Sequence, residues 1–147
     1  MQRIEKSIRI RAPVEHVYGL FRDFGNLPNL VDYVEDVIPL SSDARLSHWI
    51  VRSPTGAAAE FDAEIAEEEP NRSIGWRSLK GDVGLSGNIT LAELDNETLV
   101  HVILQWYGVS FEVPGEATSP DFQDPDKLLA EALRRFKHAA EGTQLAA

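Results

Sequence analysis

The chain has 147 residues, of which 43% are hydrophobic and 26% charged, and its formal net charge is -10 at pH 7. This composition is typical of a globular protein and excludes a wholly disordered chain, and the length suits a single domain over residues 1–147. The negative charge argues against binding to nucleic acid or to an anionic bilayer, because phosphate groups would be repelled on average.

The sequence contains no cysteine, so disulfide bonds and thiolate chemistry are excluded. The first residues, MQRIEKSIRIRAP, alternate charged and apolar side chains and lack the apolar stretch of a signal peptide. No apolar run approaches the roughly 18 residues that would span a bilayer. We therefore expect a cytoplasmic protein with no integral membrane association.

A strand followed by a helix is predicted at the start of the chain. Residues 3–10 alternate, and Pro13 suits the first turn of a helix. From residue 14 onward, apolar side chains recur at spacings of three and four, which is typical of a helix with one buried face. These residues are Val14, Val17, Tyr18, Phe21 and Phe24. Gly25 and Pro28 are expected to end the helix and to leave only a short second one, which contains Leu27 and Leu30.

Six consecutive strands are predicted in the middle of the chain. The strand-length segments are 33–40, 45–53, 57–69, 72–79, 84–94 and 97–107, and turn-forming residues separate them. Six strands without intervening helices favour an antiparallel sheet. The alternation is clearest in residues 57–65, where Glu60, Asp62 and Glu64 share one face and apolar residues share the other. One face of the sheet is therefore expected to meet solvent.

A long amphipathic helix is predicted near the end of the chain. Asp124 and Pro125 are typical of an N-cap and a first helical position, and Gly142 is expected to end the helix. Its apolar face comprises Leu128, Leu129, Ala132, Leu133, Phe136, Ala139 and Ala140. Residues 108–123 form a connection longer than most loops, and we expect it to act as a rim or lid.

The order of these elements, together with several segments, resembles the START-like helix-grip (SRPBCC) superfamily, in its branch of polyketide cyclases, dehydrases and lipid transport proteins. The segments are SIRIRAPVEHVYGLFRDFGNLPNLVDYVEDV, the HW of the third strand, EEEPNRSIGWRSLKG, SGNITL and LRRFKHAAEG. The resemblance covers nearly the whole chain. It implies an α+β fold in which a seven-stranded antiparallel sheet wraps around a long C-terminal helix. Two short helices would follow strand one, and an apolar cavity would lie between sheet and helix.

The resemblance also implies that the chain binds a hydrophobic small molecule such as a lipid or a polyketide. One alternative is a polyketide aromatase/cyclase or dehydrase acting in the same cavity, and another is a protein-interaction module with a collapsed cavity. No cofactor is expected, and the protein is expected to be a monomer or a weak homodimer.

Candidate ligand-binding residues are the side chains that alternation and resemblance direct toward the cavity. They are Tyr18, Leu27, Leu30, Trp49, Phe61, Trp76, Ser78, Ile89, Val102, Leu104, Trp106, Leu129, Leu133 and Phe136. The three tryptophans are either cavity walls or ordinary core residues, and the same two readings hold for Leu27 and Leu30. Further polar groups that would orient a ligand are Ser47, Tyr107, Asp32 and Tyr33.

No catalytic residue is assigned from the sequence. His48 is the one histidine considered for catalysis, but Ser47 and His48 are neighbours on a strand, so they point to opposite faces and cannot pair as nucleophile and base. The acidic residues of 60–64 and 67–69 are interpreted as solvated charges on the wet face and in a turn. The histidines show no spacing typical of a metal site, so no metal is expected.

Two further patterns concern the last strands. The glycines of KGDVGLSG are interpreted as turn and strand-entry residues rather than a phosphate cradle, because a strand and not a helix follows them. The last strand is apolar on both faces, with Leu99 and Ile103 opposite Val100 and Val102. This pattern predicts either a covered outer face, as in a dimer contact, or a change of phase at a bulge.

Overall fold

The computed structural model describes residues 2–31, 34–52, 58–79, 84–107 and 125–146. The chain begins with β1 (Gln2–Ile10), α1 (Val14–Arg22), the 3-10 turn η1 (Phe24–Asn26) and α2 (Leu27–Leu30). The strands β2 (Val34–Pro39), β3 (Leu46–Arg52), β4 (Ala58–Glu69), β5 (Ser73–Ser78), β6 (Gly84–Leu94) and β7 (Glu97–Tyr107) follow, and α3 (Pro125–Ala146) comes last. The predicted loop at 108–123, Asp124, Asp32, Tyr33 and the side chain of Tyr107 lie outside what is described.

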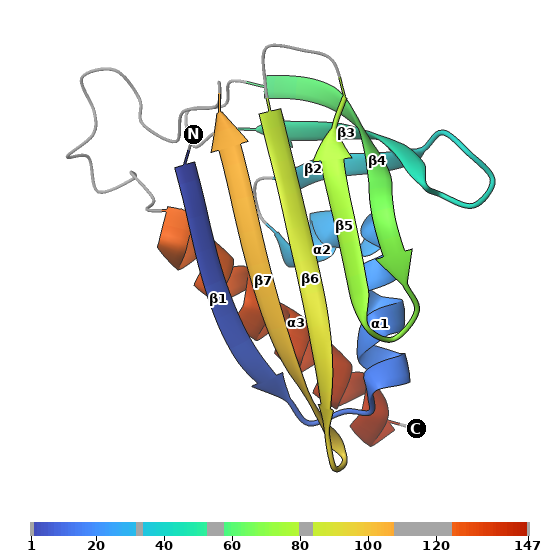
Figure 1. Cartoon of the computed structure of the whole chain (residues 1–147), viewed down its shortest axis with the longest axis vertical. Helices are drawn as coiled ribbons and strands as arrows, with labels where there is room; N and C mark the ends of the chain where they lie inside the picture. Colours follow the sequence, from blue (N-terminus) through green and yellow to red (C-terminus); the bar gives the residue numbers. More distant parts are fainter. Residues whose placement is uncertain (1, 32–33, 53–57, 80–83, 108–124, 147) are drawn as a thin grey trace.

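The seven strands form one sheet in the order β1-β7-β6-β5-β4-β3-β2, and every neighbouring pair is antiparallel. Figure 1 shows this sheet in front of α3, with α1 and α2 on the same side of the sheet as α3. The prediction of a seven-stranded antiparallel sheet around a C-terminal helix, with short helices after the first strand, is confirmed. Within the described residues, no helix combines the length and the hydropathy that a bilayer crossing requires.

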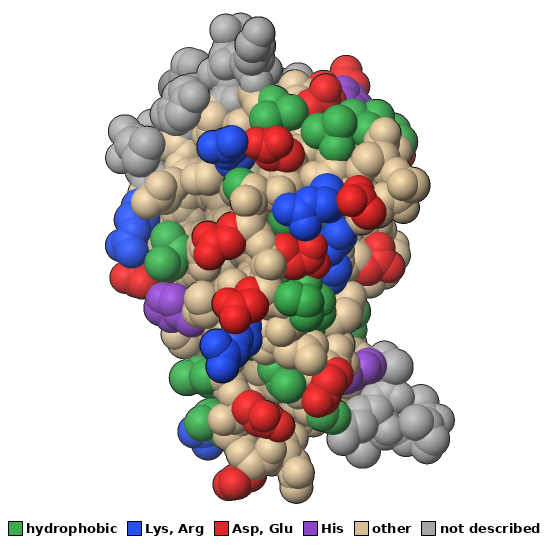
Figure 2. All heavy atoms as spheres, turned by 45° about the vertical axis from the view of Figure 1, so that its right-hand side comes forward, with side chains coloured by type: hydrophobic (Ala, Val, Ile, Leu, Met, Phe, Trp, Pro, Cys, Tyr) green, Lys and Arg blue, Asp and Glu red, His purple; other side chains and the backbone are tan. Residues whose placement is uncertain are grey.

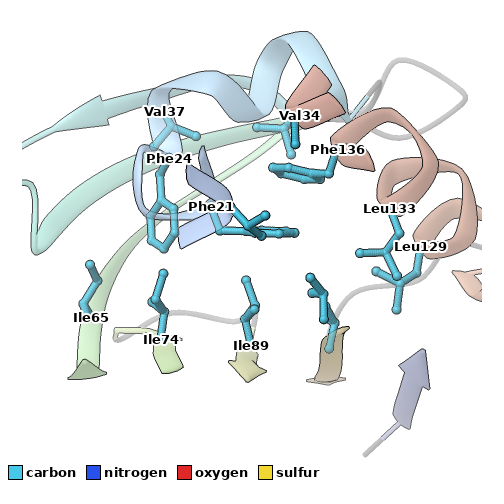
Figure 3. Close-up of a cluster of buried hydrophobic side chains, with 14 of the residues drawn as sticks. Phe21, Phe24, Val34, Val37, Ile65, Ile74, Ile89, Leu129, Leu133 and Phe136 are labelled. Atoms are coloured by element: carbon cyan, nitrogen blue, oxygen red, sulfur yellow. The ribbon is translucent and has the colours of Figure 1, made fainter. Parts of the chain in front are cut away.

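The concave face of the sheet packs against aromatic residues of the helices. In Figure 3, Ile65, Ile74 and Ile89, from three adjacent strands, point toward the layer that contains Phe21 and Phe136. The rings of Phe21 in α1 and Phe136 in α3 are stacked, with centroids 4.2 Å apart and planes 17° apart. Stacked aromatic pairs contribute about 0.5 to 1.5 kcal/mol beyond the area they bury, so this contact holds the two helices together over the sheet.

The alternation predicted for residues 57–65 is confirmed from Glu60 to Ile65. Phe61 and Ile65 are buried, while Glu60 and Asp62 are exposed on the opposite, convex face. Figure 2 shows acidic and basic side chains interspersed over one side of the molecule, with only small, separated hydrophobic areas. The convex face therefore meets solvent, as expected for an antiparallel sheet with one packed face.

A bulge in β4 changes the phase of this alternation. Ile65 pairs with Trp76, but the next paired residue of β4 is Glu67, so the register shifts by one position. Glu68 consequently pairs with Ile74 and turns toward the concave face, where its side chain is only 16% exposed. The interpretation of residues 67–69 as solvated turn residues is wrong for Glu68, because the bulge redirects it.

The prediction for the end of the C-terminal helix is also wrong. Gly142 does not end the C-terminal helix, which continues to Ala146. Glycine ends a helix when it turns the backbone into the left-handed region, and Gly142 does not adopt that conformation. Of the two alternatives considered for the last strand, the change of phase is absent, since β7 pairs with β1 and β6 without a register shift. Leu99 is consequently on the convex face, 36% exposed.

Gly87 gives the indole of Trp76 room to lie against the sheet. The two residues are directly opposite each other on β6 and β5. A Cβ atom at position 87 would lie 2.1 Å from Cη2 of Trp76, which is far inside contact distance. The prediction that Gly87 is a turn or strand-entry residue is therefore wrong. Gly87 lies within the strand, where the Trp76 side chain on the concave face approaches the backbone closely.

Replacing Gly87 with alanine is expected to destabilise the protein by about 2 kcal/mol, because the new methyl group overpacks the Trp76 indole. Gly19→Ala is the matched control, since Gly19 is exposed in α1 and an added Cβ meets nothing within 4 Å. It is expected to stabilise by about 0.5 to 1 kcal/mol through helix propensity. Urea unfolding of both variants measures the difference, and equal stabilities would contradict this packing.

Candidate functional site

The structure places all the candidate residues of the sheet on its concave face. Buried candidates are Trp49, Phe61, Ile89, Val102, Trp106, Leu129, Leu133 and Phe136. Half-buried candidates are Tyr18, Leu27, Leu30, Trp76, Ser78 and Leu104. Leu27 and Leu30 both pack against the buried core, as ordinary core residues do. Their contact with a ligand stays a prediction.

Four aromatic residues meet near the middle of the concave face, and we call Phe24, Trp49, Phe61 and Trp76 the aromatic cluster. Trp49 stacks on Phe61 with centroids 5.7 Å apart, and it lies nearly parallel to Trp76 at 6.4 Å. Phe24, from η1, meets both tryptophans edge-on at 5.7 and 5.8 Å. From the sequence, Phe24 was predicted only to lie on the buried face of the first helix. No pattern in the sequence shows that η1 turns its ring toward the tryptophans.

The two tryptophans of the cluster differ in their hydrogen bonding. Trp49 Nε1 donates to Ser47 Oγ at 2.9 Å, so its indole N–H is satisfied. Trp76 Nε1 is buried and has no hydrogen-bond acceptor among the described residues. A buried donor without a partner costs about 1 to 3 kcal/mol, and most such groups in native proteins are paired. The aromatic cluster therefore contains one unused donor in apolar surroundings.

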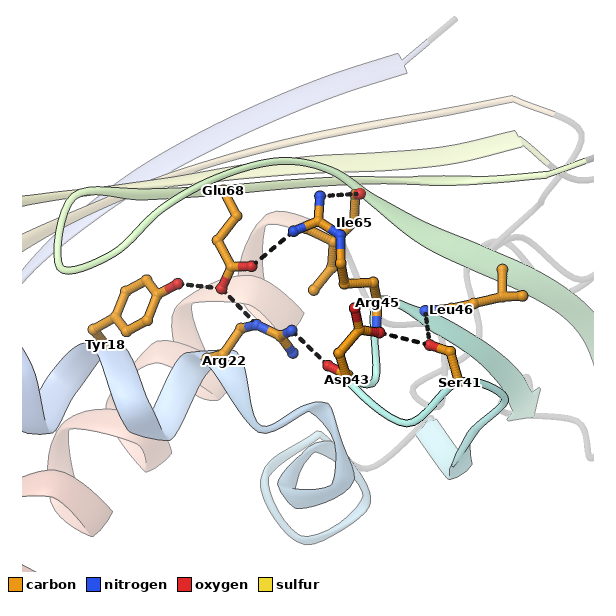
Figure 4. Close-up of polar contacts among 8 residues, drawn as sticks. All are labelled: Tyr18, Arg22, Ser41, Asp43, Arg45, Leu46, Ile65 and Glu68. Carbon is orange, nitrogen blue, oxygen red and sulfur yellow. Dashed lines mark hydrogen bonds and ion pairs between the residues drawn. The ribbon is translucent and has the colours of Figure 1, made fainter.

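A polar network lies beside the cluster on the concave side, and we call Tyr18, Arg22, Arg45 and Glu68 the Glu68 clamp. Figure 4 shows Tyr18 and Arg22 of α1 converging on the carboxylate of Glu68. Tyr18 Oη and Arg22 Nε donate to Oε2, the latter at 2.6 Å, and Arg45 Nη1 donates to Oε1 at 3.1 Å. Arg22 Nη2 also donates to the Asp43 carbonyl at 2.8 Å. The clamp thus ties the end of α1 to the bulge of β4 and to the β2–β3 turn.

The clamp is poorly suited to proton transfer near neutral pH. Burial opposes ionisation of Glu68, but hydrogen bonds from Tyr18 and Arg22 outweigh it and lower the pKa of Glu68. Burial, together with the hydrogen bond to Glu68, raises the pKa of Tyr18 to about 12. A general acid or base works best with a pKa near the operating pH, and neither group meets that condition. The hydroxyl of Tyr18, predicted to orient a ligand, is already engaged by Glu68.

Among the hollows at the surface, two that described residues line bear on the predicted site. The larger, about 590 Å³, lies between the first turn of α1, the β4–β5 turn and β6, and is lined by Val14, Glu15, Pro70, Asn71, Arg72, Leu91, Ala92 and Glu93. The smaller, about 180 Å³, is lined by Arg77, Ser78, Gly84, Leu85, Ser86, Gln105 and Trp106. It brings together two candidate residues, Ser78 and Trp106. Neither hollow lies between the sheet and α3, where the cavity was predicted.

His48 lies on the convex face, away from the aromatic cluster. Its Nδ1 is 2.7 Å from Asp62 Oδ1 and its Nε2 is 2.9 Å from Glu60 Oε1. Ser47 is buried on the other face, which confirms that Ser47 and His48 cannot act together. The hydrogen bonds to Glu60 and Asp62 raise the pKa of His48 above its usual value of 6.5. In the described part of the chain, no three His, Asp or Glu side chains are arranged to hold a metal ion.

Comparison with known proteins adds a family and a fold to this geometry. A family model described as "Polyketide cyclase / dehydrase and lipid transport" matches residues 1–141. An uncharacterised 17.2 kDa protein of Streptomyces lincolnensis is 31% identical over 97 residues, which are 66% of this chain. The match spans 63% of that relative's length, a little under two thirds.

Two solved structures share the arrangement of sheet and helices. A START superfamily protein from Mycobacterium smegmatis matches with a TM-score of 0.67 and 22% identity, over 96% of this chain and 95% of its own. An aromatase/cyclase from Streptomyces sp. R1128 matches with a TM-score of 0.72 and 17% identity, over 95% and 93% of the two chains. At these identities the likeness shows the helix-grip fold alone.

Glu68→Gln is expected to destabilise the protein by about 1 to 3 kcal/mol at pH 7, because it removes the charge that accepts three hydrogen bonds. The folded-state pKa of Glu68 is lowered, so its contribution is present above the ordinary pKa of 4.5 and is lost as the pH falls through the folded value. Glu64→Gln is the control, since Glu64 pairs with Arg77 on the convex face. Chemical unfolding should show a large difference between the two variants at pH 7, and the difference should shrink as the pH falls through the folded-state pKa of Glu68.

His48→Gln is expected to flatten the pH dependence of stability above pH 6. The folded-state pKa of His48 is raised, so its contribution is fully present below about 6.5 and is lost as the pH rises through the folded value. The free energy of unfolding of the parent protein should therefore fall toward that of the variant between pH 6 and pH 9. His138→Gln, at an exposed position of α3, is the control. Parallel curves for parent and His48→Gln would refute the assignment.

Proposed function

The chain belongs to the polyketide cyclase/dehydrase and lipid transport family, and on this premise we propose that it binds an apolar small molecule against the aromatic cluster. The observation that carries the proposal is the buried indole N–H of Trp76, which has no acceptor among the described residues. Ligand sites are mostly apolar and contain a few polar groups that fix orientation. The side chain of Trp76 supplies both an apolar surface, its indole ring, and a polar group, its N–H.

The proposed ligand has a flat or flexible apolar body and an oxygen atom that accepts a hydrogen bond from Trp76 Nε1. Its apolar body would be stabilised by roughly 25 cal/mol for each Å² removed from water, mostly against Trp49 and Trp76. The hydrogen bond would add about 0.5 to 1.5 kcal/mol, because it satisfies a donor that the empty protein leaves without a partner. A carbonyl or hydroxyl oxygen serves equally well in this role.

Phe24, Leu27 and Leu30 would form the cover of this site. They belong to η1 and α2, which have three and four residues and contribute few backbone hydrogen bonds of their own. Short elements with few buried bonds open locally at low cost in free energy, whereas core strands open only with the whole protein. In the proposal, the ligand enters where Phe24 now touches the two tryptophans, and Leu27 and Leu30 close over it.

Binding without turnover is the function that these contacts favour. The Glu68 clamp holds a neutral tyrosine and an ionised carboxylate at neutral pH. The tyrosine hydroxyl donates to Glu68, and Glu68 also accepts from Arg22 and Arg45. His48 lies on the opposite face of the sheet from the aromatic cluster. A cyclase or dehydrase would need acid and base groups converging on the ligand. No such set converges on Trp76 among the described residues.

The proposal predicts that the protein binds 2-acetylnaphthalene about fivefold more tightly than 2-ethylnaphthalene, since only the ketone accepts a hydrogen bond. Trp76→Phe should abolish this preference while it keeps an aromatic ring in place. Trp49→Phe is the matched control and should retain the preference, because the Trp49 N–H is already bonded to Ser47. NMR titration with labelled indole nitrogens gives the dissociation constants and the response of the Trp76 N–H.

Two results would count against the proposal. If neither probe binds at millimolar concentration, the interior is closed, and the alternative of an interaction module with a collapsed cavity is favoured. If both bind equally and Trp76→Phe changes nothing, an apolar site exists but Trp76 does not orient its ligand.

A further inference from the structure

A serine, a histidine and a glutamate meet on the convex face of the sheet, far from the aromatic cluster. Ser7 of β1 and His101 of β7 are directly opposite each other in the strand register. Glu5 lies two residues before Ser7, so its side chain is on the same face of β1. The serine and histidine are 94 positions apart in sequence, and only the pairing of the first strand with the last brings them together.

Both ring nitrogens of His101 are engaged. Ser7 Oγ is 2.6 Å from Nδ1, and Glu5 Oε2 is 2.8 Å from Nε2. The hydrogen bond to His101 is the largest cause that lowers the pKa of Glu5, so Glu5 is ionised at neutral pH. An ionised carboxylate can only accept, so in the neutral imidazole Nε2 carries the ring proton and the lone pair of Nδ1 faces the Ser7 hydroxyl. Serine is then the donor and histidine the acceptor, as a nucleophile and its base require.

We propose that Ser7 is an activated nucleophile that accepts acyl groups from activated esters or thioesters, with His101 as its general base. This activity is separate from ligand binding at the aromatic cluster, which lies on the other face of the sheet. The proposal rests on the geometry of the three side chains and on their accessibility: Ser7 is exposed, and the side chains of His101 and Glu5 are 39% and 45% exposed.

The reaction is a simple transfer. Ser7 Oγ forms a bond to the acyl carbon while its proton passes to Nδ1 of His101, and the resulting imidazolium is stabilised by Glu5. The bond between the acyl carbon and the leaving oxygen or sulfur then breaks, and the proton on Nδ1 passes to the leaving group or to water. The products are an ester on Ser7 and the free alcohol or thiol. No oxidant, metal or further reactant takes part.

Exposure limits the class of acyl donor. Water screens the charges of an open site, so the developing oxyanion is stabilised less than in a closed active site. Arg3 also donates to Glu5 at 3.4 Å, which divides the carboxylate between two partners. Donors with good leaving groups need the least stabilisation, and these are aryl esters and thioesters. General base assistance typically contributes about 10²- to 10⁴-fold, and an exposed site is expected to reach at most the low end of that range.

The test is acetylation by p-nitrophenyl acetate, followed by peptide mass spectrometry. Ser41 serves as the internal reference, because its hydroxyl donates to Asp43 rather than to a histidine. Ser7 should be acetylated about 10- to 100-fold faster than Ser41, and hydroxylamine should remove the group because it is an ester. His101→Gln should reduce the Ser7 rate to that of Ser41. Thr90→Ala is the matched control, since Thr90 is opposite His101 on β6, and the Ser7 rate should remain that of the parent.

Glu5 is a positioning residue, and its test needs a second readout. In the parent protein, the nitrogen chemical shifts of His101 should show the proton on Nε2, whereas Glu5→Ala should shift the tautomer balance and slow acetylation of Ser7. Cooperative melting of each variant establishes that it is folded. Acetylation of Ser7 no faster than that of Ser41, or a Ser7 rate unchanged in His101→Gln, would overturn the proposal.

Discussion

The stacking of Phe21 on Phe136 is the contact on which the interior of this protein depends. It joins α1, at the start of the chain, to α3, at its end, above the concave face of the sheet. Since β1 also pairs with β7, the start of the chain is tied both to the last strand and to the last helix. The short segment of η1 and α2 follows α1, and its residue Phe24 contacts Trp49 and Trp76.

The order and extent of the strands could be predicted from the sequence because one face of the sheet is wet, so alternation marks each strand. The helix faces follow from the same kind of pattern. The bulge in β4 could not be predicted, since residues 67–69 are all glutamate and no change of periodicity marks the point where Glu68 turns inward. The end of α3 was misjudged because Gly142 resembles a terminating glycine, although its backbone stays out of the left-handed region.

The sequence predicts which face of the sheet the tryptophans occupy, but not their hydrogen-bond partners. Alternation correctly directs Trp49, Trp76 and Trp106 to the concave face, because each lies in a strand of clear phase. It cannot tell that Trp49 finds a hydrogen-bond partner in Ser47 while Trp76 finds none among the described residues, since that depends on side-chain rotation. The approach of Ser7 to His101 depends on strand register between distant segments, which composition and local spacing do not encode.

The central claim is that the concave side around Trp76 holds an apolar ligand, and native mass spectrometry of the purified protein tests it most directly. The account predicts an additional mass on the native protein that disappears on denaturation, and organic extraction should recover an apolar molecule that contains oxygen. Titration of the stripped protein with that molecule should then shift the indole N–H resonance of Trp76. A bare chain mass, with no shift of that resonance across oxygen-bearing apolar probes, would contradict the claim.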